Sequence, residues 1–174
     1  MNIYNFENVS VVGRIAYGIM CAEEFLTHKY PNKDWAIVFR DFWKITELEL
    51  WDDWMSEIIE IIPEYFFEFD NYELSDFEFL TKNKYLNLKN VYANTYEDVN
   101  VILKMVYDLA NSHAYSSISG KGEESLFQLE KIIVLLENEG IDLPDDKEVK
   151  THLISERKGW GEPFNGMSLS KVVK

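Results

Sequence analysis

The sequence predicts an all-α protein, a single compact helical domain of about six or seven helices over residues 1–174. Apolar residues recur at spacings of three and four in several long segments, which is the pattern of amphipathic helices. No alternating pattern typical of strands recurs along the chain. Because 47% of the residues are hydrophobic and 15% are aromatic, we expect a substantial buried core rather than disorder.

Two helices are predicted in the first quarter of the chain, over residues 9–30 and 34–44. Gly13 and Gly18 lie inside the first, and each costs about 1 kcal/mol relative to alanine, so we expect both to allow close approach of a neighbouring helix. Asp34 is placed to assist the N-terminus of the second. A wide aromatic stripe runs from this helix into the next segment and comprises Trp35, Phe39, Phe42, Trp43, Trp51 and Trp54. We expect the stripe to be core, and a ligand pocket is the alternative.

A third helix is predicted over residues 47–62, and Pro63 ends or kinks it near Ile62 because proline has no N–H to donate. This helix lies in the most distinctive part of the chain, since residues 45–81 contain 12 acids and neither Lys nor Arg. The segment therefore carries a formal charge of −12, whereas the rest of the chain, with 19 acids and 17 bases, carries −2. Apolar residues are interleaved with the acids, so we expect the segment to be folded.

The second half of the chain contains two long predicted helices, over residues 97–114 and 123–139. Thr95 is placed to cap the first of them, with Asp98 three residues further on. Gly140 is placed to end the second in the left-handed conformation that glycine adopts readily.

Three further segments show less regular patterns. Ser75 is expected to cap a short helix that reaches Leu80, and residues 86–96 are interpreted as extended or irregular. A short helix is predicted over residues 147–157. It precedes a glycine-rich C-terminal tail that begins at about residue 158.

The composition disfavours several classes of partner and location. A net charge of −14 argues against binding to nucleic acid or to an anionic membrane, since both reward Lys and Arg, so a charged partner is expected to be basic. The single Cys21 cannot form an internal disulfide. Neither a signal-type N-terminus nor an apolar run of membrane-spanning length is present, and we expect a cytoplasmic protein.

No catalytic motif, metal site or cofactor site is predicted, because phosphate loops, nucleophile elbows and paired cysteines are all missing from the sequence. Glu24 and His28, four residues apart, would share one helix face, a spacing that metal-dependent hydrolases use, but His113 and His152 bring no matching carboxylate. The alternative hypothesis is a helical enzyme or ligand-binding domain that uses Glu24, His28 and a pocket under the aromatic helices. Cys21 is expected to behave as a small hydrophobic residue.

The third predicted helix places five carboxylates on one ridge, opposite its apolar face. They are Glu49, Asp53, Glu57, Glu60 and Glu64. Like charges at these spacings destabilise a helix by a few tenths of a kcal/mol per pair, yet the chain places no Lys among them. A docking surface for a cationic partner and a solvated face of biased composition are both open explanations, and cation binding is a third.

Two stretches resemble a known family. The first is Gly13-Arg14-Ile15-Ala16-Tyr17-Gly18 with Cys21-Ala22-Glu23 and the aromatic helices between Trp35 and Trp54; the second is Gly159-Trp160-Gly161-Glu162-Pro163-Phe164-Asn165-Gly166 with Ser168-Leu169-Ser170. Together they resemble the small all-helical immunity proteins of bacterial polymorphic toxin systems, of the type numbered six. The resemblance implies a cytoplasmic protein without catalysis that binds and neutralises a cognate toxin domain.

The resemblance and the charge pattern together predict a basic, nuclease-like toxin as the partner, with the carboxylates occupying its cleft in place of phosphates. Aromatic residues near Pro63 would supply apolar anchors. The predicted toxin-binding residues are Glu49, Asp53, Glu57, Glu60, Glu64, Tyr65, Phe67, Glu68 and Asp70. Self-association through Phe66 and Phe67 is the remaining alternative.

Overall fold

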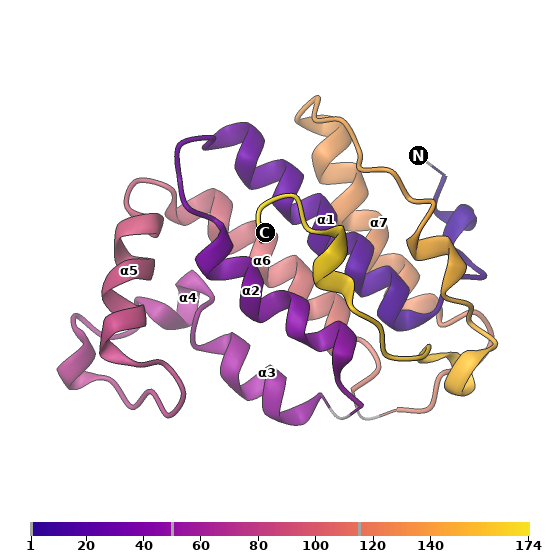
Figure 1. The fold of residues 1–174 in the computed structure, drawn as a ribbon, viewed down its shortest axis with the longest axis horizontal. Helices are drawn as coiled ribbons and strands as arrows, with labels where there is room; N and C mark the ends of the chain where they lie inside the picture. Colours follow the sequence, from indigo (N-terminus) through magenta and orange to yellow (C-terminus); the bar gives the residue numbers. More distant parts are fainter. Residues whose placement is uncertain (1, 50, 115) are drawn as a thin grey trace.

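The computed structural model describes residues 2–49, 51–114 and 116–174, and the chain is all-helical, as the sequence predicts (Figure 1). The α-helices are α1 (Val11–Lys29), α2 (Ala36–Trp43), α3 (Asp52–Ile59), α4 (Pro63–Phe66), α5 (Lys82–Tyr92), α6 (Tyr96–Asn111) and α7 (Glu123–Asn138). The 3-10 helices are η1 (Ile3–Phe6), η2 (Lys44–Glu47), η3 (Tyr72–Leu74), η4 (Val149–Thr151), η5 (Glu156–Gly159) and η6 (Gly166–Leu169). Within these described ranges there is no strand, and an isolated bridge joins Val9 and Leu153.

Helices α1, α6 and α7 pack against one another and form the centre of the fold. Gly18 of α1 lies at their meeting point, where a Cβ would stand 2.7 Å from Leu109 Cδ2 and 3.3 Å from Ile132 Cδ1. At Gly13 a Cβ would stand 3.2 Å from the carbonyl oxygen of Val149 in η4. The close approach predicted at both glycines is therefore confirmed, with a 3-10 helix as the neighbour of Gly13.

The single helix predicted over residues 47–62 is wrong. The chain leaves η2 at Glu47, takes an extended conformation at Leu48, and begins α3 only at Asp52; Leu50, within the predicted helix, lies outside the described residues. The Thr46 carbonyl, which a continuing helix would use internally, accepts the Phe164 N–H at 2.8 Å instead. The backbone turns again after Ile59, and Pro63 starts α4 rather than merely ending a helix.

Two predictions in the middle of the chain are also wrong. The short helix predicted from Ser75 to Leu80 does not form, and the Ser75 hydroxyl donates to the Tyr72 carbonyl at the end of η3 instead of capping a new helix. Residues 86–96, interpreted as extended or irregular, are largely helical because they belong to α5, which the Thr81 side chain caps. The buried face of α5 decides the outcome despite its asparagines, since tertiary packing outweighs local propensity.

Of the remaining predictions, one is confirmed and two are wrong. Gly140 adopts a left-handed conformation, with φ of 67°, just after α7, as predicted. Thr95 does not cap α6, because its hydroxyl donates to the Val91 and Tyr92 carbonyls of α5. The helix predicted over residues 147–157 is replaced by η4, an extended stretch and η5.

The extended stretch has a tertiary cause. Between η4 and η5, the His152 carbonyl accepts the Ser10 N–H at 2.8 Å, and the Ile154 N–H donates to the Asn8 carbonyl at 2.9 Å. These bonds tie the C-terminal part of the chain to the segment that precedes α1. Beyond them, the glycine-rich tail is packed on the fold, and Figure 1 shows it in yellow, running back across α1 and α2.

Candidate functional site

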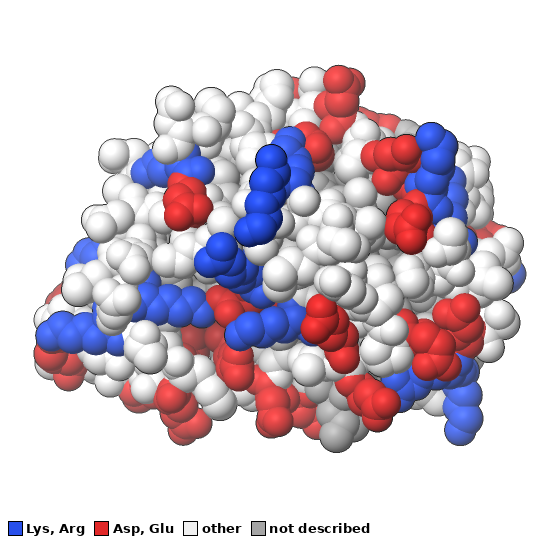
Figure 2. Space-filling view, viewed as in Figure 1, with Lys and Arg blue, Asp and Glu red and all other residues white. Residues whose placement is uncertain are grey.

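The described residues of the acidic segment 45–81 lie in η2, α3, α4, η3 and the adjoining loops, and we call the exposed surface of this segment the acidic face. Many of its apolar residues, among them Trp54, Ile58 and Phe66, are buried, which confirms that the segment is folded. Ten of the 12 acids are exposed: Glu47, Glu49, Asp52, Asp53, Glu64, Glu68, Asp70, Glu73, Asp76 and Glu78. Figure 2 shows acidic side chains gathered along the lower edge of the molecule, where Figure 1 places α3.

The predicted ridge of five carboxylates is broken into three parts, because its residues do not share one helix. Glu49 precedes α3, Asp53 and Glu57 lie on α3, Glu60 forms its C-cap, and Glu64 lies on α4. The continuous ridge predicted from the spacing is therefore wrong, although all five residues remain at least partly accessible to solvent.

Glu60 holds the fold together. Its carboxylate accepts backbone N–H groups from Glu78 at 2.7 Å, Phe79 at 3.1 Å and Leu80 at 2.7 Å, and thereby fixes the loop before α5. A carboxylate engaged by three backbone donors is a structural element of the loop. Of the nine predicted toxin-binding residues, Glu60 is consequently the one least available to a partner.

Two other ridge residues form ion pairs within the chain. Glu57 faces Lys44, with 3.6 Å between Oε2 and Nζ, and Glu64 pairs with Lys104 of α6. Both pairs are exposed, so each contributes about 0–1 kcal/mol and opens at little cost. Within the acidic face, Glu73 forms a similar exposed pair with Lys82.

Eight acids of this face make no side-chain hydrogen bond or ion pair with any other residue that the structure describes. They are Glu47, Glu49, Asp52, Asp53, Glu68, Asp70, Asp76 and Glu78. Four of the predicted contact residues, Glu49, Asp53, Glu68 and Asp70, belong to this group. The negative potential of the face is therefore only partly compensated from within the molecule.

Exposed aromatic rings lie beside these acids. Phe67 is 37% exposed and its ring centroid lies 5.7 Å from that of Tyr96, which is 42% exposed. Tyr65 is only half-buried. The sequence reasoning found Tyr65 and Phe67 but missed Tyr96, because it belongs to α6 and reaches the face only through the fold.

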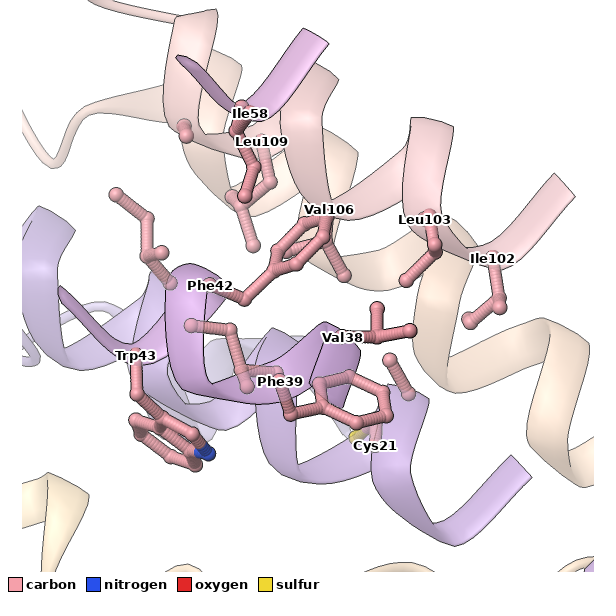
Figure 3. Packing of buried hydrophobic residues seen from close by; sticks show 14 of the residues in the cluster. Cys21, Val38, Phe39, Phe42, Trp43, Ile58, Ile102, Leu103, Val106 and Leu109 are labelled. Atoms are coloured by element: carbon pink, nitrogen blue, oxygen red, sulfur yellow. The ribbon is translucent and has the colours of Figure 1, made fainter. Parts of the chain in front are cut away.

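The aromatic stripe is core, as expected, for every member except Trp51. Trp35, Phe39, Phe42, Trp43 and Trp54 are each at most 2% exposed. Figure 3 shows Val38 and Phe42 of α2 directed towards Leu103 and Val106 of α6. Cys21 is also buried here, and burial raises the pKa of its thiol well above the ordinary range, so it is an inert core residue.

Trp51 instead lines a cavity of about 480 Å³ where the acidic segment meets the C-terminal segment. We call it the Trp cavity, because the rings of Trp51 and Trp160 meet in it edge to face with centroids 4.7 Å apart. Its lining residues are Val12, Leu48, Glu49, Trp51, Asp52, Ala114, Arg157, Lys158, Trp160, Gly161 and Pro163. The sequence reasoning missed the C-terminal half of this lining, and the run Arg157-Lys158-Gly159-Trp160 was the available signal.

Glu24 and His28 do not form the centre of a metal site in this structure. The Glu24 carboxylate pairs with Lys171 at 2.6 Å, and His28 is exposed. Among the described residues, no group of three or more His, Cys, Asp or Glu side chains could hold a metal ion. Likewise, none of the helices that the structure describes is long and apolar enough to cross a membrane.

The two stretches that carry the family resemblance meet at a buried carboxylate. Glu23 of α1 accepts hydrogen bonds from Trp43 Nε1 at 2.7 Å, from the Ser170 hydroxyl at 2.5 Å and from the Lys171 N–H at 2.8 Å. Burial raises the pKa of Glu23, although these three donors oppose the rise. The first stretch, the aromatic helices and the C-terminal segment are thus joined through one side chain.

Comparison of the chain with protein-family models, with curated proteins and with solved structures gave no match.

Proposed function

We propose that this chain is a cytoplasmic immunity protein without catalytic activity, which binds and neutralises a cognate, basic, nuclease-like toxin domain through its acidic face. The observation that carries the proposal is the set of exposed carboxylates without partners inside the described fold, next to exposed aromatic rings. A solvated face of ordinary composition would intersperse Lys among the acids, and residues 45–81 contain none.

Charge and apolar anchors serve different steps of such binding. A patch of one sign accelerates encounter with a partner of the opposite sign, which suits a protein that must intercept a toxin quickly. Interface affinity then depends on a few well-packed anchors, and aromatic residues are enriched among them. Phe67 and Tyr96 supply such rings, and Tyr65 lies two residues before Phe67 in the sequence.

The fold narrows the set of contact residues that the proposal uses. Asp53, Glu68 and Asp70 are the principal carboxylates, since they are exposed and have no hydrogen bond or ion pair within the described chain. Glu57 and Glu64 also contribute, because each can release its exposed Lys within the chain and pair with a basic side chain of the toxin instead. Glu60 is excluded from this set because its carboxylate holds the loop of residues 78–80.

The test combines three charge reversals, Asp53→Lys, Glu68→Lys and Asp70→Lys, in one variant. The toxin to use is to be sought in the genes immediately upstream of the one that encodes this chain, as the C-terminal domain of a large secreted protein. We expect the parent chain to protect cells that express this domain and the triple variant to fail, with an association rate constant lowered at least roughly tenfold.

The matched control reverses three exposed acids outside the acidic face, Glu130→Lys, Asp142→Lys and Glu148→Lys. This control changes the net charge by the same amount, so it should still protect if position matters more than total charge. Protection by the folded triple variant at the parent level would show that the acidic face is not the interface. Failure of the parent chain itself to protect would contradict the immunity function.

A further inference from the structure

The Trp cavity has the size and lining of a site for a small organic molecule. Its volume of about 480 Å³ falls within the range of roughly 300–1,000 Å³ that is common for such sites. Trp51, Trp160 and Pro163 give it an aromatic and apolar body. These rings offer broad surfaces against which another planar or aliphatic group can pack.

Charges of both signs line this apolar body. Glu49 and Asp52 come from the acidic segment, and Arg157 and Lys158 come from η5. All four residues are exposed, and none forms an ion pair with a residue that the structure describes. Two acids and two bases thus line one cavity without neutralising each other.

The basic side of the cavity is fixed to the core. Arg157 and Lys158 both adopt left-handed backbone conformations, with φ of 40° and 58°, which residues with a Cβ adopt only at an energetic cost. The Trp160 carbonyl accepts the Val12 N–H of α1 at 3.0 Å. Gly161 lies so close to α1 that a Cβ would stand 2.3 Å from Ser10 Oγ. A site held in place before binding loses less conformational entropy when a ligand arrives.

We infer that the Trp cavity binds a zwitterionic ligand with an aromatic or aliphatic body, the chemistry of a short peptide with free ends. The ligand's ammonium group faces Glu49 and Asp52, and its carboxylate faces Arg157 and Lys158. Its apolar side chains pack against Trp51 and Trp160. This inference is independent of the proposed immunity function, since it concerns a small ligand and needs no toxin.

The test uses calorimetric titration of the full chain with the dipeptide Leu-Phe in four forms. These are the free dipeptide, its N-acetyl form, its C-terminal amide and the form blocked at both ends. We expect the free dipeptide to bind at least about fivefold more tightly than either singly blocked form, because each blocked form loses one ionic contact of about 1 kcal/mol.

Paired substitutions assign each charge of the ligand to one side of the cavity. Arg157→Asn with Lys158→Asn removes the bases while keeping residues that tolerate left-handed backbone. This variant should bind the free dipeptide as weakly as the parent binds the amide, and should bind the amide as the parent does. Glu49→Gln with Asp52→Asn should bind the free dipeptide as weakly as the parent binds the N-acetyl form, and should bind the N-acetyl form as the parent does.

The control variants remove equal charge outside the cavity, Arg40→Gln with Lys174→Gln and Glu130→Gln with Glu148→Gln, and should leave all four affinities unchanged. Circular dichroism confirms that each variant is folded. The inference is overturned if no form binds at millimolar concentration or if all four forms bind equally. It is also overturned if the cavity variants weaken every form to the same extent, because the charges would then act only on the fold.

Discussion

Glu23 joins three separate parts of the chain at one carboxylate, which is 1% exposed. Its oxygens accept hydrogen bonds from Trp43 of α2 and from Ser170 and Lys171 of the C-terminal segment. Glu23→Gln places an amide N–H₂ group opposite a donor and leaves at least one buried donor without an acceptor. We expect the free energy of unfolding to fall by about 1–3 kcal/mol at pH 5, measured by denaturant titration.

The neighbouring residue provides the control for this substitution. Glu24→Gln makes the same chemical change one position along α1, at a partly exposed ion pair with Lys171. Such a pair contributes about 0–1 kcal/mol, so this variant should stay near the parent. Equal stability losses in the two variants would contradict a special role for the buried carboxylate.

The raised pKa of Glu23 also predicts a direction of pH dependence. Burial raises this pKa above its ordinary value of 4.5, so the folded state binds more protons than the unfolded state in the window above that value. The contribution of Glu23 to stability is therefore greatest at low pH and declines as pH rises through the window. The stability difference between the parent and Glu23→Gln should shrink from pH 4 upwards, and a difference that grows with pH would contradict the raised value.

Among the elements, the loop that leads to α5 is held by the carboxylate of Glu60, in a region where the sequence predicts a short helix. Three consecutive N–H groups, those of Glu78, Phe79 and Leu80, point at its carboxylate. Glu60→Gln removes the charge and one acceptor oxygen, and hydrogen bonds to a charged group contribute about 1.5–3 kcal/mol. We expect hydrogen exchange at these three amides to become roughly tenfold to a hundredfold faster.

Glu57→Gln is the matched control for this loop, because it lies one turn earlier on α3 and faces only an exposed Lys44. Exchange at the three loop amides should be unchanged in this variant. An equal acceleration in both variants would mean that loss of charge on the acidic face, rather than the bonds to Glu60, loosens the loop.

The elements that the sequence predicts well are those whose own periodicity is strong. Helices α1 and α7 follow such a pattern, and the Gly140 turn requires a residue that adopts positive φ. The prediction of one helix over residues 47–62 is wrong because a distant residue affects where the helix begins: the Phe164 N–H donates to the Thr46 carbonyl. Local spacing carries no information about a partner more than a hundred residues away.

The same limit applies to the candidate site. Charge composition locates the acidic face, and the apolar residues interleaved with the acids correctly indicate that this segment is folded. Composition does not separate Glu60, which is committed to the fold, from Asp53, which is free of bonds within the described chain. The Trp cavity cannot be predicted from the sequence for the same reason, since Trp51 and Trp160 come together only through the packing of the C-terminal segment on α1.

For the whole molecule, the acidic face predicts an unusual response to salt. Eight of its carboxylates have no partner within the described chain, whereas three, Glu57, Glu64 and Glu73, face a Lys from a flanking segment or another helix. Screening weakens both kinds of interaction, and the unpaired acids outnumber the pairs. Net repulsion therefore dominates and opposes the compact state at low ionic strength.

Raising the salt concentration from about 0.01 M to 0.15 M shortens the screening length from about 30 Å to about 8 Å, so the melting temperature should rise. Neutralising Asp53, Glu68 and Asp70 as Asp53→Asn, Glu68→Gln and Asp70→Asn should raise it at low salt and reduce the further gain from salt. The control, Glu130→Gln with Asp142→Asn and Glu148→Gln, should keep most of the parent's salt response. A parent melting temperature that falls with salt would mean that the ion pairs outweigh the repulsion. If the proposed function holds, the neutralised variant gains stability and loses toxin binding together, because the same three carboxylates repel each other in the free protein and attract bases in the complex.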